Sequence, residues 1–135
     1  SNFKNQEYYI NTNITYTYDT ETKTVTGTYG TATAKALDDS GSGEGLVKGL
    51  KSMRKEDINS QARNILEQTD WMVIREADGG EAVPSNIKTY RASVRTKSNE
   101  MCTKIDEASD VDALAALYEY SGDPLVRPLG EFPVL

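Results

Sequence analysis

The sequence of 135 residues contains no histidine and a single cysteine. Without histidine, the chain lacks the commonest general base, the commonest metal ligand and the usual activating partner of a nucleophile. Cys102 cannot form a disulfide within the chain, and its neighbours predict a buried or half-buried helix position rather than an activated thiolate. These shortages argue against an enzyme, and we expect no cofactor.

Long apolar runs are also missing. No stretch of about 18 apolar residues is present to span a bilayer, and the first residues lack the basic and apolar parts of a signal peptide. We therefore expect a protein that stays in the cytosol where it is made, without a membrane partner. The 15 basic residues are outnumbered by 21 acidic ones, which gives a net charge of -6. Because this charge repels a phosphate backbone on average, nucleic acid is not an expected partner either.

Two acidic clusters were candidates for metal binding, Asp38-Asp39 with Glu44 and Asp106-Glu107 with Asp110 and Asp112. Neither has the alternating oxygen ligands and the final bidentate glutamate of a calcium loop. We interpret the first as part of a solvated linker and the second as charge that favours a helix end. The glycines of the first cluster also lack the Lys-Ser or Lys-Thr ending of a phosphate-binding loop. No metal site is predicted.

The pattern of residues predicts an α+β fold that begins with a β-hairpin arm over residues 1–37. Ile14, Tyr16 and Tyr18 alternate with threonines, and residues 24–29 alternate again. An isolated hairpin is marginal in water, so we expect the helices or another chain to cover its aromatic face. The threonine face is expected to contact solvent. Residues 38–51, rich in glycine and serine, are predicted to form a flexible linker.

A small helical domain is predicted over residues 52–121. An amphipathic helix over 52–68 precedes Thr69-Asp70-Trp71, and Trp71 is expected to pack between the helices that flank this turn. A second helix starts after Pro84, which is tolerated in a first helical turn. Its apolar stripe consists of Ile87, Tyr90, Val94, Met101 and Ile105, and the two helices should form an antiparallel hairpin.

A third, shorter helix is expected after Ser109, which forms a weak capping box with Asp112. Val111, Leu114 and Leu117 line one of its faces. The remaining segment, 122–135, is predicted to be an extended proline-rich apolar arm, because its prolines forbid a regular helix. Two arrangements of this arm stay open. It either packs back along the helices or docks on a partner.

Three arginines are candidates for binding an anion or a partner carboxylate. Arg91 and Arg95 lie four residues apart on one predicted helix, and Arg63 lies on the preceding one. The alternative is a set of bridges within the chain to Asp70 or Glu67, which contribute little where they are exposed. Asp70 also lies where a carboxylate can accept backbone or arginine hydrogen bonds and fix the Trp71 turn.

The segment from Gln61 to Ile105 resembles the phage tail assembly chaperone family. Its distinctive residues are Arg63-Asn64, Leu66, Thr69-Asp70-Trp71, Tyr90-Arg91 and Arg95, arranged around a helix, a turn and a helix. Val94 stands where the family has leucine, and Thr96 replaces the acidic residue expected after the second arginine. The resemblance covers less than half of the chain.

The resemblance implies a non-enzymatic bacteriophage protein that binds a tail, baseplate or fibre protein. Apolar arms at both ends favour a structural virion component, located in the tail or in the host cytoplasm during assembly, with homo-oligomerisation possible. Two alternatives are a transient tail-fibre assembly chaperone that is absent from the finished particle, and a phage regulatory protein that binds a host protein. The candidate partner-binding residues are Arg63, Asp70, Trp71, Tyr90, Arg91, Arg95, Leu125, Leu129 and Phe132.

Overall fold

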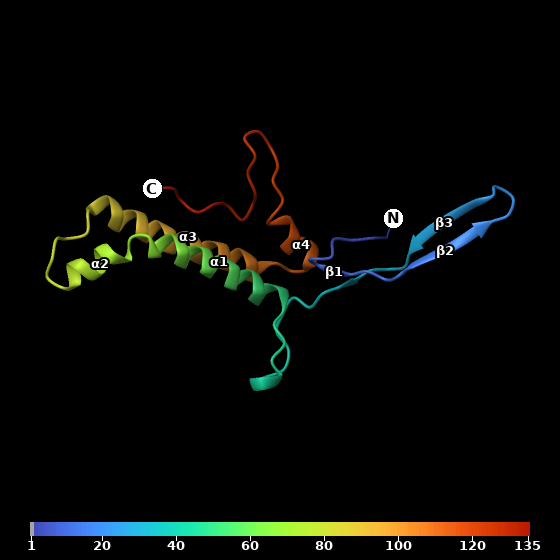
Figure 1. Ribbon diagram of the computed structural model, residues 1–135, viewed down its shortest axis with the longest axis horizontal. Helices are drawn as coiled ribbons and strands as arrows, with labels where there is room; N and C mark the ends of the chain where they lie inside the picture. The colour runs from blue at the N-terminus through green and yellow to red at the C-terminus, as the bar shows by residue number, and fades with distance from the viewer. Residues whose placement is uncertain (1) are drawn as a thin grey trace. The chain divides into compact units, whose positions relative to one another are not determined.

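The computed structural model describes residues 2–135 and confirms the α+β fold class (Figure 1). The chain divides into two compact units, one ending at Leu50 and the other beginning at Lys51. Small antiparallel strands form the first unit, and four α-helices belong mainly to the second. None of the helices in the described part of the chain is long and apolar enough to cross a membrane.

The first unit is built on an antiparallel β-ribbon. Strand β2 (Ile14–Asp19) pairs with β3 (Thr24–Tyr29), which confirms the predicted hairpin. A second short pair follows in the same register, where β1 (Tyr9–Ile10) meets β4 (Thr33–Ala34). Between the two pairs, the backbone amide of Gly30 donates to Oγ1 of Thr12 at 2.7 Å. The two strand pairs therefore share one register, and neither strand has an extra residue between them.

The turn of the hairpin is organised by one carboxylate. Oδ1 of Asp19 accepts hydrogen bonds from the backbone amides of Glu21 at 2.9 Å and Thr22 at 3.0 Å. These two amides hold the pKa of Asp19 below its usual value, with the Thr22 amide as the largest cause. Lys23 completes the turn with a left-handed backbone, at a φ of 53°.

The flexible linker was expected over residues 38–51, but its last two residues belong to α1 (Leu50–Glu67), and residues 38–49 have hydrogen bonds of their own. Ser40 and Val47 form a β-bridge around a short 3-10 helix, Gly43–Gly45. The amide of Gly49 donates to Oδ1 of Asp39 at 2.7 Å. A Cβ atom at position 49 would lie 2.3 Å from the carbonyl oxygen of Leu37. Only glycine therefore fits at the point where the loop closes.

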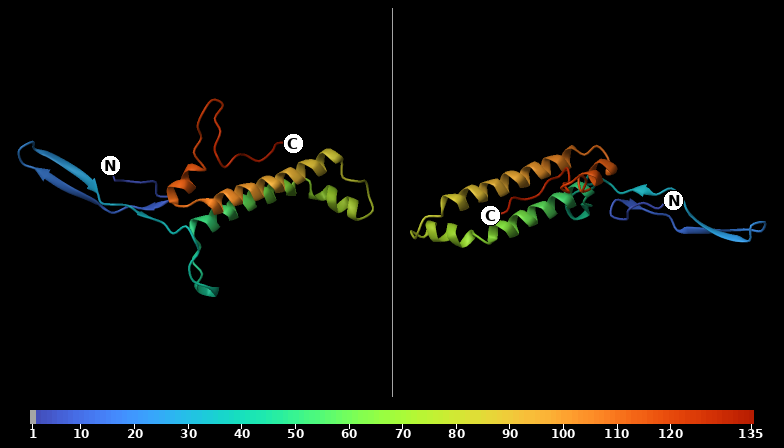
Figure 2. Two further views of the ribbon diagram at one scale, coloured as in Figure 1. Left: turned by 180° about the vertical axis from the view of Figure 1, so that it is seen from behind. Right: turned by 90° about the horizontal axis from the view of Figure 1, so that it is seen from above.

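The second unit is organised around two long helices, α1 (Leu50–Glu67) and α3 (Ser85–Glu107). They lie side by side and antiparallel in both views of Figure 2, as predicted. The predicted stripe on α3 is confirmed, because Ile87, Val94, Met101 and Ile105 are buried and Tyr90 is half-buried. Ile58 and Ala62 are buried on α1. Core formation thus follows the helical spacing of apolar residues.

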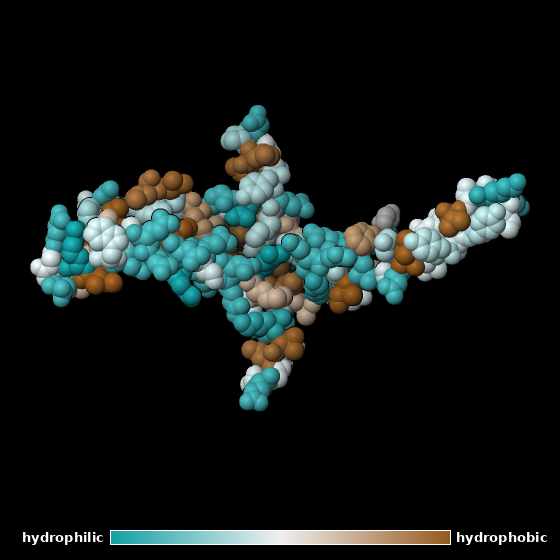
Figure 3. Space-filling model, in the orientation of Figure 1, coloured by the Kyte–Doolittle hydropathy of each residue, from teal (hydrophilic) through white to brown (hydrophobic). Residues whose placement is uncertain are grey.

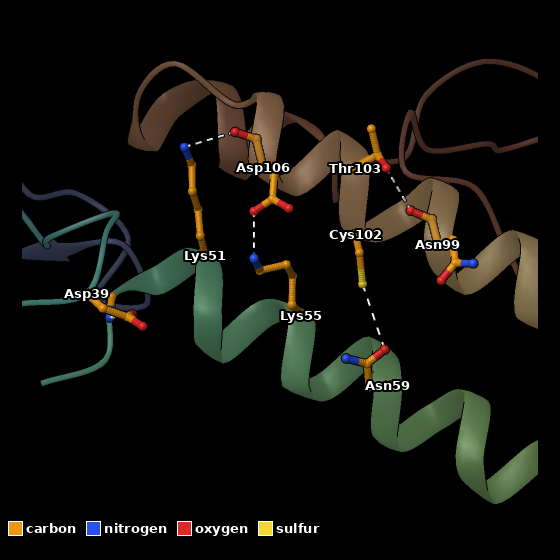
Figure 4. Close-up of polar contacts among 9 residues, drawn as sticks. Asp39, Lys51, Lys55, Asn59, Asn99, Cys102, Thr103 and Asp106 are labelled. Atoms are coloured by element: carbon orange, nitrogen blue, oxygen red, sulfur yellow. Dashed lines mark hydrogen bonds and ion pairs between the residues drawn. The ribbon is translucent and has the colours of Figure 1, made fainter. Parts of the chain in front are cut away.

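Polar contacts join α1 to the C-terminal half of α3 (Figure 4). Nζ of Lys55 lies 2.6 Å from Oδ1 of Asp106, and Nζ of Lys51 donates to the carbonyl of Asp106 at 3.1 Å. Cys102 is half-buried and its Sγ lies 3.9 Å from Oδ1 of Asn59. Burial raises the pKa of the Cys102 thiol, which confirms the prediction of a thiol that is not activated.

The third predicted helix is α4 (Val111–Ala116), and Val111 and Leu114 are buried as expected. Its cap differs from the prediction by one residue. Asp110, not Ser109, is the N-cap, and its side chain accepts a hydrogen bond from the amide of Ala113 at 2.7 Å. A carboxylate at this position also interacts favourably with the helix dipole, an advantage that a serine hydroxyl lacks.

The C-terminal segment lacks helix and strand and packs back on the helical unit over part of its length. Leu129 is fully buried, and its amide donates to the carbonyl of Leu117 at 3.0 Å. Nζ of Lys104 donates to the carbonyl of Pro128 at 2.6 Å. Residues 133–135 then border a shallow groove along the first turns of α3. The first of the two arrangements left open by the sequence is therefore the one found for this part of the arm.

Candidate functional site

The segment with the family resemblance forms a junction between α1, α3 and a helix that the sequence did not predict, α2 (Asp70–Ala77). Arg91 of α3 lies at the centre of this junction and is only 7% exposed. Its Nη1 donates to the carbonyl of Leu66 at 2.7 Å and to Oγ1 of Thr69 at 2.6 Å. Its Nη2 donates to Oδ1 of Asp70 at 2.7 Å.

These bonds explain why the residue types are needed at these positions. Leu66 lies in the last turn of α1, where carbonyl groups have no partner within the helix and attract a cation. Asp70 lies in the first turn of α2, where a carboxylate is favourable. Thr69, which is buried, accepts from Arg91 while its own hydroxyl donates to Leu66. Arg91 therefore joins the end of one helix to the start of the next.

Of the two alternatives weighed for Arg91, the bridge within the chain to Asp70 is the one found, and Asp70 accepts an arginine hydrogen bond as expected. The choice of Arg91 as a partner contact does not fit its position, because its side chain is buried. The other two arginines behave differently. Arg63 and Arg95 are exposed, and neither has an ion pair or hydrogen bond from its side chain within residues 2–135. They remain available to a partner.

Helix α2 presents an apolar surface next to this junction. Trp71 is 53% exposed, Val73 40% and Ile74 67%. The prediction that Trp71 packs between the flanking helices is wrong, because Asp70 starts a new helix and turns the following side chain outward. The Arg75 guanidinium lies over the Trp71 ring, with 5.0 Å between the guanidinium carbon and the ring centroid. The sequence shows that Trp71 to Ile74 form an apolar cluster. It does not show that these side chains are exposed.

Two residues of α2, Arg75 and Glu76, form ion pairs with residues outside this helix. Nη1 of Arg75 lies 3.1 Å from a carboxylate oxygen of Glu81, and Nζ of Lys88 lies 2.8 Å from one of Glu76. The Lys88 hydrogen bond is the largest cause that lowers the pKa of Glu76. Trp71 and Ile74 lie one helical turn apart, whereas Val73 lies on another side of the helix. We call these three exposed side chains together the α2 surface.

Comparison with protein-family models, with curated proteins and with solved structures finds no match for the chain. The family suggested by the residues around Trp71 therefore stays a prediction.

The three candidate residues of the C-terminal arm differ in exposure. Leu125 is 69% exposed near a β-bridge between Ser121 and Val126, and Phe132 is half-buried. Leu129 is fully buried and belongs to the core of the helical unit. The choice of Leu129 as a partner contact therefore does not fit its position, because a buried side chain does not reach a partner. The apolar character of Leu129 and the neighbouring prolines do not indicate from the sequence that this side chain is buried.

An aromatic and arginine cluster fixes the start of this arm. The Arg127 guanidinium lies near the rings of Tyr118 and Tyr120, and its Nε is 2.7 Å from a carboxylate oxygen of Glu131. The Tyr120 hydroxyl donates to Glu131, and this bond is the largest cause that raises the pKa of Tyr120. The cluster holds Leu125 and Val126 at an exposed turn. Figure 3 shows exposed hydrophobic residues, coloured brown, in several separate places on the surface.

Among residues 2–135, no group of three or more acidic or cysteine side chains is placed to hold a metal ion. The acidic clusters considered from the sequence instead contribute to loop closure and helix capping through Asp39 and Asp110. What the candidate site offers chemically is the exposed apolar area of α2, the exposed arginines Arg63 and Arg95, and the hydrogen-bonded junction at Arg91.

Proposed function

We propose that the chain is a non-enzymatic, tail-associated bacteriophage protein that binds another tail, baseplate or fibre protein through its α2 surface and its C-terminal arm. The observation that supports this proposal most directly is the exposure of Trp71, Val73 and Ile74 on a helix that Arg91 holds in place. Exposed apolar side chains gathered on one element are characteristic of interaction sites. Trp and Arg are also the residues that most often dominate the binding energy.

In this proposal, the residues that carry the family resemblance have two different physical roles. Thr69, Asp70 and Arg91, three of its distinctive residues, form one hydrogen-bonded junction. Such a junction positions α2 before a partner arrives, which reduces the conformational entropy lost on binding. Trp71 follows directly and supplies exposed area. In the proposed function, Thr69, Asp70 and Arg91 therefore support α2, and Trp71 contacts the partner.

The proposal is tested by quantitative mass spectrometry of purified virions and of infected-cell lysate from the phage that carries this gene. A fixed copy number relative to known tail proteins supports a structural component. Abundance in the lysate with absence from particles supports the transient chaperone instead. Copurification of host proteins without any phage protein would contradict both and support a host-directed regulator.

The binding surface is tested separately with Trp71→Ser and a matched control, Leu46→Ser. Both apolar side chains are about half exposed, at 53% and 46%, so neither change removes a core residue. Trp71→Ser is expected to weaken capture of the phage partner by at least about tenfold, the effect of losing a central aromatic contact. Leu46→Ser should leave capture within about twofold, because Leu46 lies outside α2 and the C-terminal arm. Equal capture by wild type and Trp71→Ser would contradict the role of α2.

A further inference from the structure

The β2–β3 hairpin has one aromatic face and one threonine face. The cross-strand pairs on the first face are Ile14 with Tyr29, Tyr16 with Gly27, and Tyr18 with Val25. The alternating pairs on the other face are Thr15 with Thr28, Thr17 with Thr26, and Asp19 with Thr24. This separation is the pattern of a sheet that buries one face and exposes the other to water.

The aromatic face is not buried within the chain. Tyr16 is 67% exposed, Tyr18 61% and Val25 65%. Within the described residues of the first unit, nothing covers these side chains. Phe3 extends the face, because its ring lies 5.1 Å from the ring of Tyr29 and is itself 45% exposed. We call Phe3, Ile14, Tyr16, Tyr18 and Val25 the aromatic face.

The face is continuous because of one glycine. A side chain at Gly27 would lie 2.7 Å from Cδ1 of Ile14 and 3.2 Å from Cε1 of Tyr16. These two side chains thus already cover the glycine and leave no hole in the middle of the face. An occupant must therefore be another flat apolar surface rather than a single inserted side chain.

The lack of charged residues on the two strands limits which partner surface can pack against the aromatic face. Residues 12–18 and 24–34 contain no charged residue and no proline, although 27% of the whole chain is charged. The charged residues of the hairpin, Asp19, Glu21 and Lys23, lie at the end of β2 and in the turn that follows, and none belongs to the aromatic face. A charged partner surface would lose its hydration here without gaining an ion pair. The aromatic face of a second copy is uncharged and flat in the same way.

We propose that two copies of this chain associate through their aromatic faces, with the threonine faces on the outside. Such an isologous contact repeats the same residues on both sides and needs no further surface. The exposed parts of the five side chains amount to about 500 Å² per copy, judged from typical aromatic areas. The total of about 1,000 Å² lies at the lower limit for a specific interface. The dimer is therefore weak and reversible.

Sedimentation equilibrium of the purified full chain tests this inference, from about 1 µM to about 1 mM, a range that covers weak association. Tyr18→Lys and Thr17→Lys form a matched pair, because they place the same charge on neighbouring, exposed residues of β2 but on opposite faces. Tyr18→Lys should raise the dissociation constant by at least about tenfold, since the lysine meets an apolar surface. Thr17→Lys should leave it within about twofold, because this residue stays in solvent.

A third variant, Tyr18→Thr, keeps a residue that favours β-strands and should also weaken the dimer. Circular dichroism and the amide spectrum of the hairpin show whether each variant retains its fold. A wild-type chain that stays monomeric throughout would overturn the inference, as would equal weakening by Tyr18→Lys and Thr17→Lys, which indicates pairing of strand edges. The measurement uses this chain alone, so its failure leaves the proposed tail association to be judged by the virion experiment.

Discussion

At the scale of single residues, Arg91 has the largest structural role among the candidate side chains. It is buried, and its guanidinium donates three hydrogen bonds that connect two helix ends. Bonds between a charged donor and well-placed acceptors are about twice as strong as neutral ones. Arg95, four residues later on the same helix, is exposed and makes no such bonds within the described chain. Two arginines that look alike in the sequence therefore have different functions.

We expect Arg91→Met to lower the free energy of unfolding by about 2–3 kcal/mol, because it removes a buried, charged donor from the Leu66 carbonyl and from Oγ1 of Thr69 and leaves only the neutral bonds between these two residues. The partly exposed Asp70 adds less, since water replaces part of its lost bond. Arg95→Met is the matched control and should change the value by less than about 0.5 kcal/mol. Urea unfolding followed by helical circular dichroism measures both. Similar losses in the two variants would contradict the role of Arg91.

The thiol of Cys102 should react slowly with an alkylating agent. Its pKa is raised above the ordinary 9.0, mainly by burial, so the thiolate forms less readily than in an unfolded chain. The thiol form contributes its stabilisation fully below pH 9.0, and this contribution is lost as the pH rises through the raised pKa. Iodoacetamide labelling between pH 7 and 10, with the urea-unfolded chain as control, measures the shift. A folded chain that reacts faster than the unfolded one would disprove it.

At the scale of elements, α2 and the hairpin turn show how a few polar contacts determine where apolar residues point. The sequence predicts the two strands correctly, because alternation with period two is a local property. It does not predict α2, because a helix of 8 residues with four consecutive apolar side chains has no clear face. Its start depends on Asp70, whose partner Arg91 lies 21 residues away.

The hairpin turn should loosen at acidic pH. The pKa of Asp19 is lowered by the amides of Thr22 and Glu21, so the ionised carboxylate is the form that stabilises the turn. This stabilisation is fully present above the ordinary pKa of 3.8 and is lost as the pH falls through the lowered value. Amide hydrogen exchange at Glu21 and Thr22 reports the change. Asp19→Asn keeps an acceptor without titrating, so its exchange should show no such pH step.

At the scale of the whole molecule, charge and exposed apolar area point to the same class of partner. The chain carries a net charge of -6, while its large exposed apolar residues include members of the hairpin, the loop over residues 38–49, α2 and the C-terminal arm. Each of the two compact units thus exposes apolar side chains. A protein partner is favoured by these features, since apolar area is buried on protein association and negative charge opposes nucleic acid.

We therefore expect no binding to double-stranded DNA or RNA, even at about 50 mM salt, where electrostatic attraction is strongest. A mobility-shift assay with a random duplex checks this expectation, and a basic protein of similar size serves as the positive control. A shift that disappears as salt rises would contradict it, because this dependence shows that phosphates are contacted.

The sequence by itself determined the local features of this protein. Alternation predicted β2 and β3, and helical spacing predicted the buried residues Ile87, Val94, Met101 and Ile105, because periodicity depends on neighbouring residues alone. The tertiary structure decided which of several similar residues are buried. Arg91 and Leu129 lie inside while Trp71 lies outside, since each outcome depends on a hydrogen bond or a packing contact between distant segments. Such contacts form only when the chain returns on itself, and no local pattern encodes where it does so.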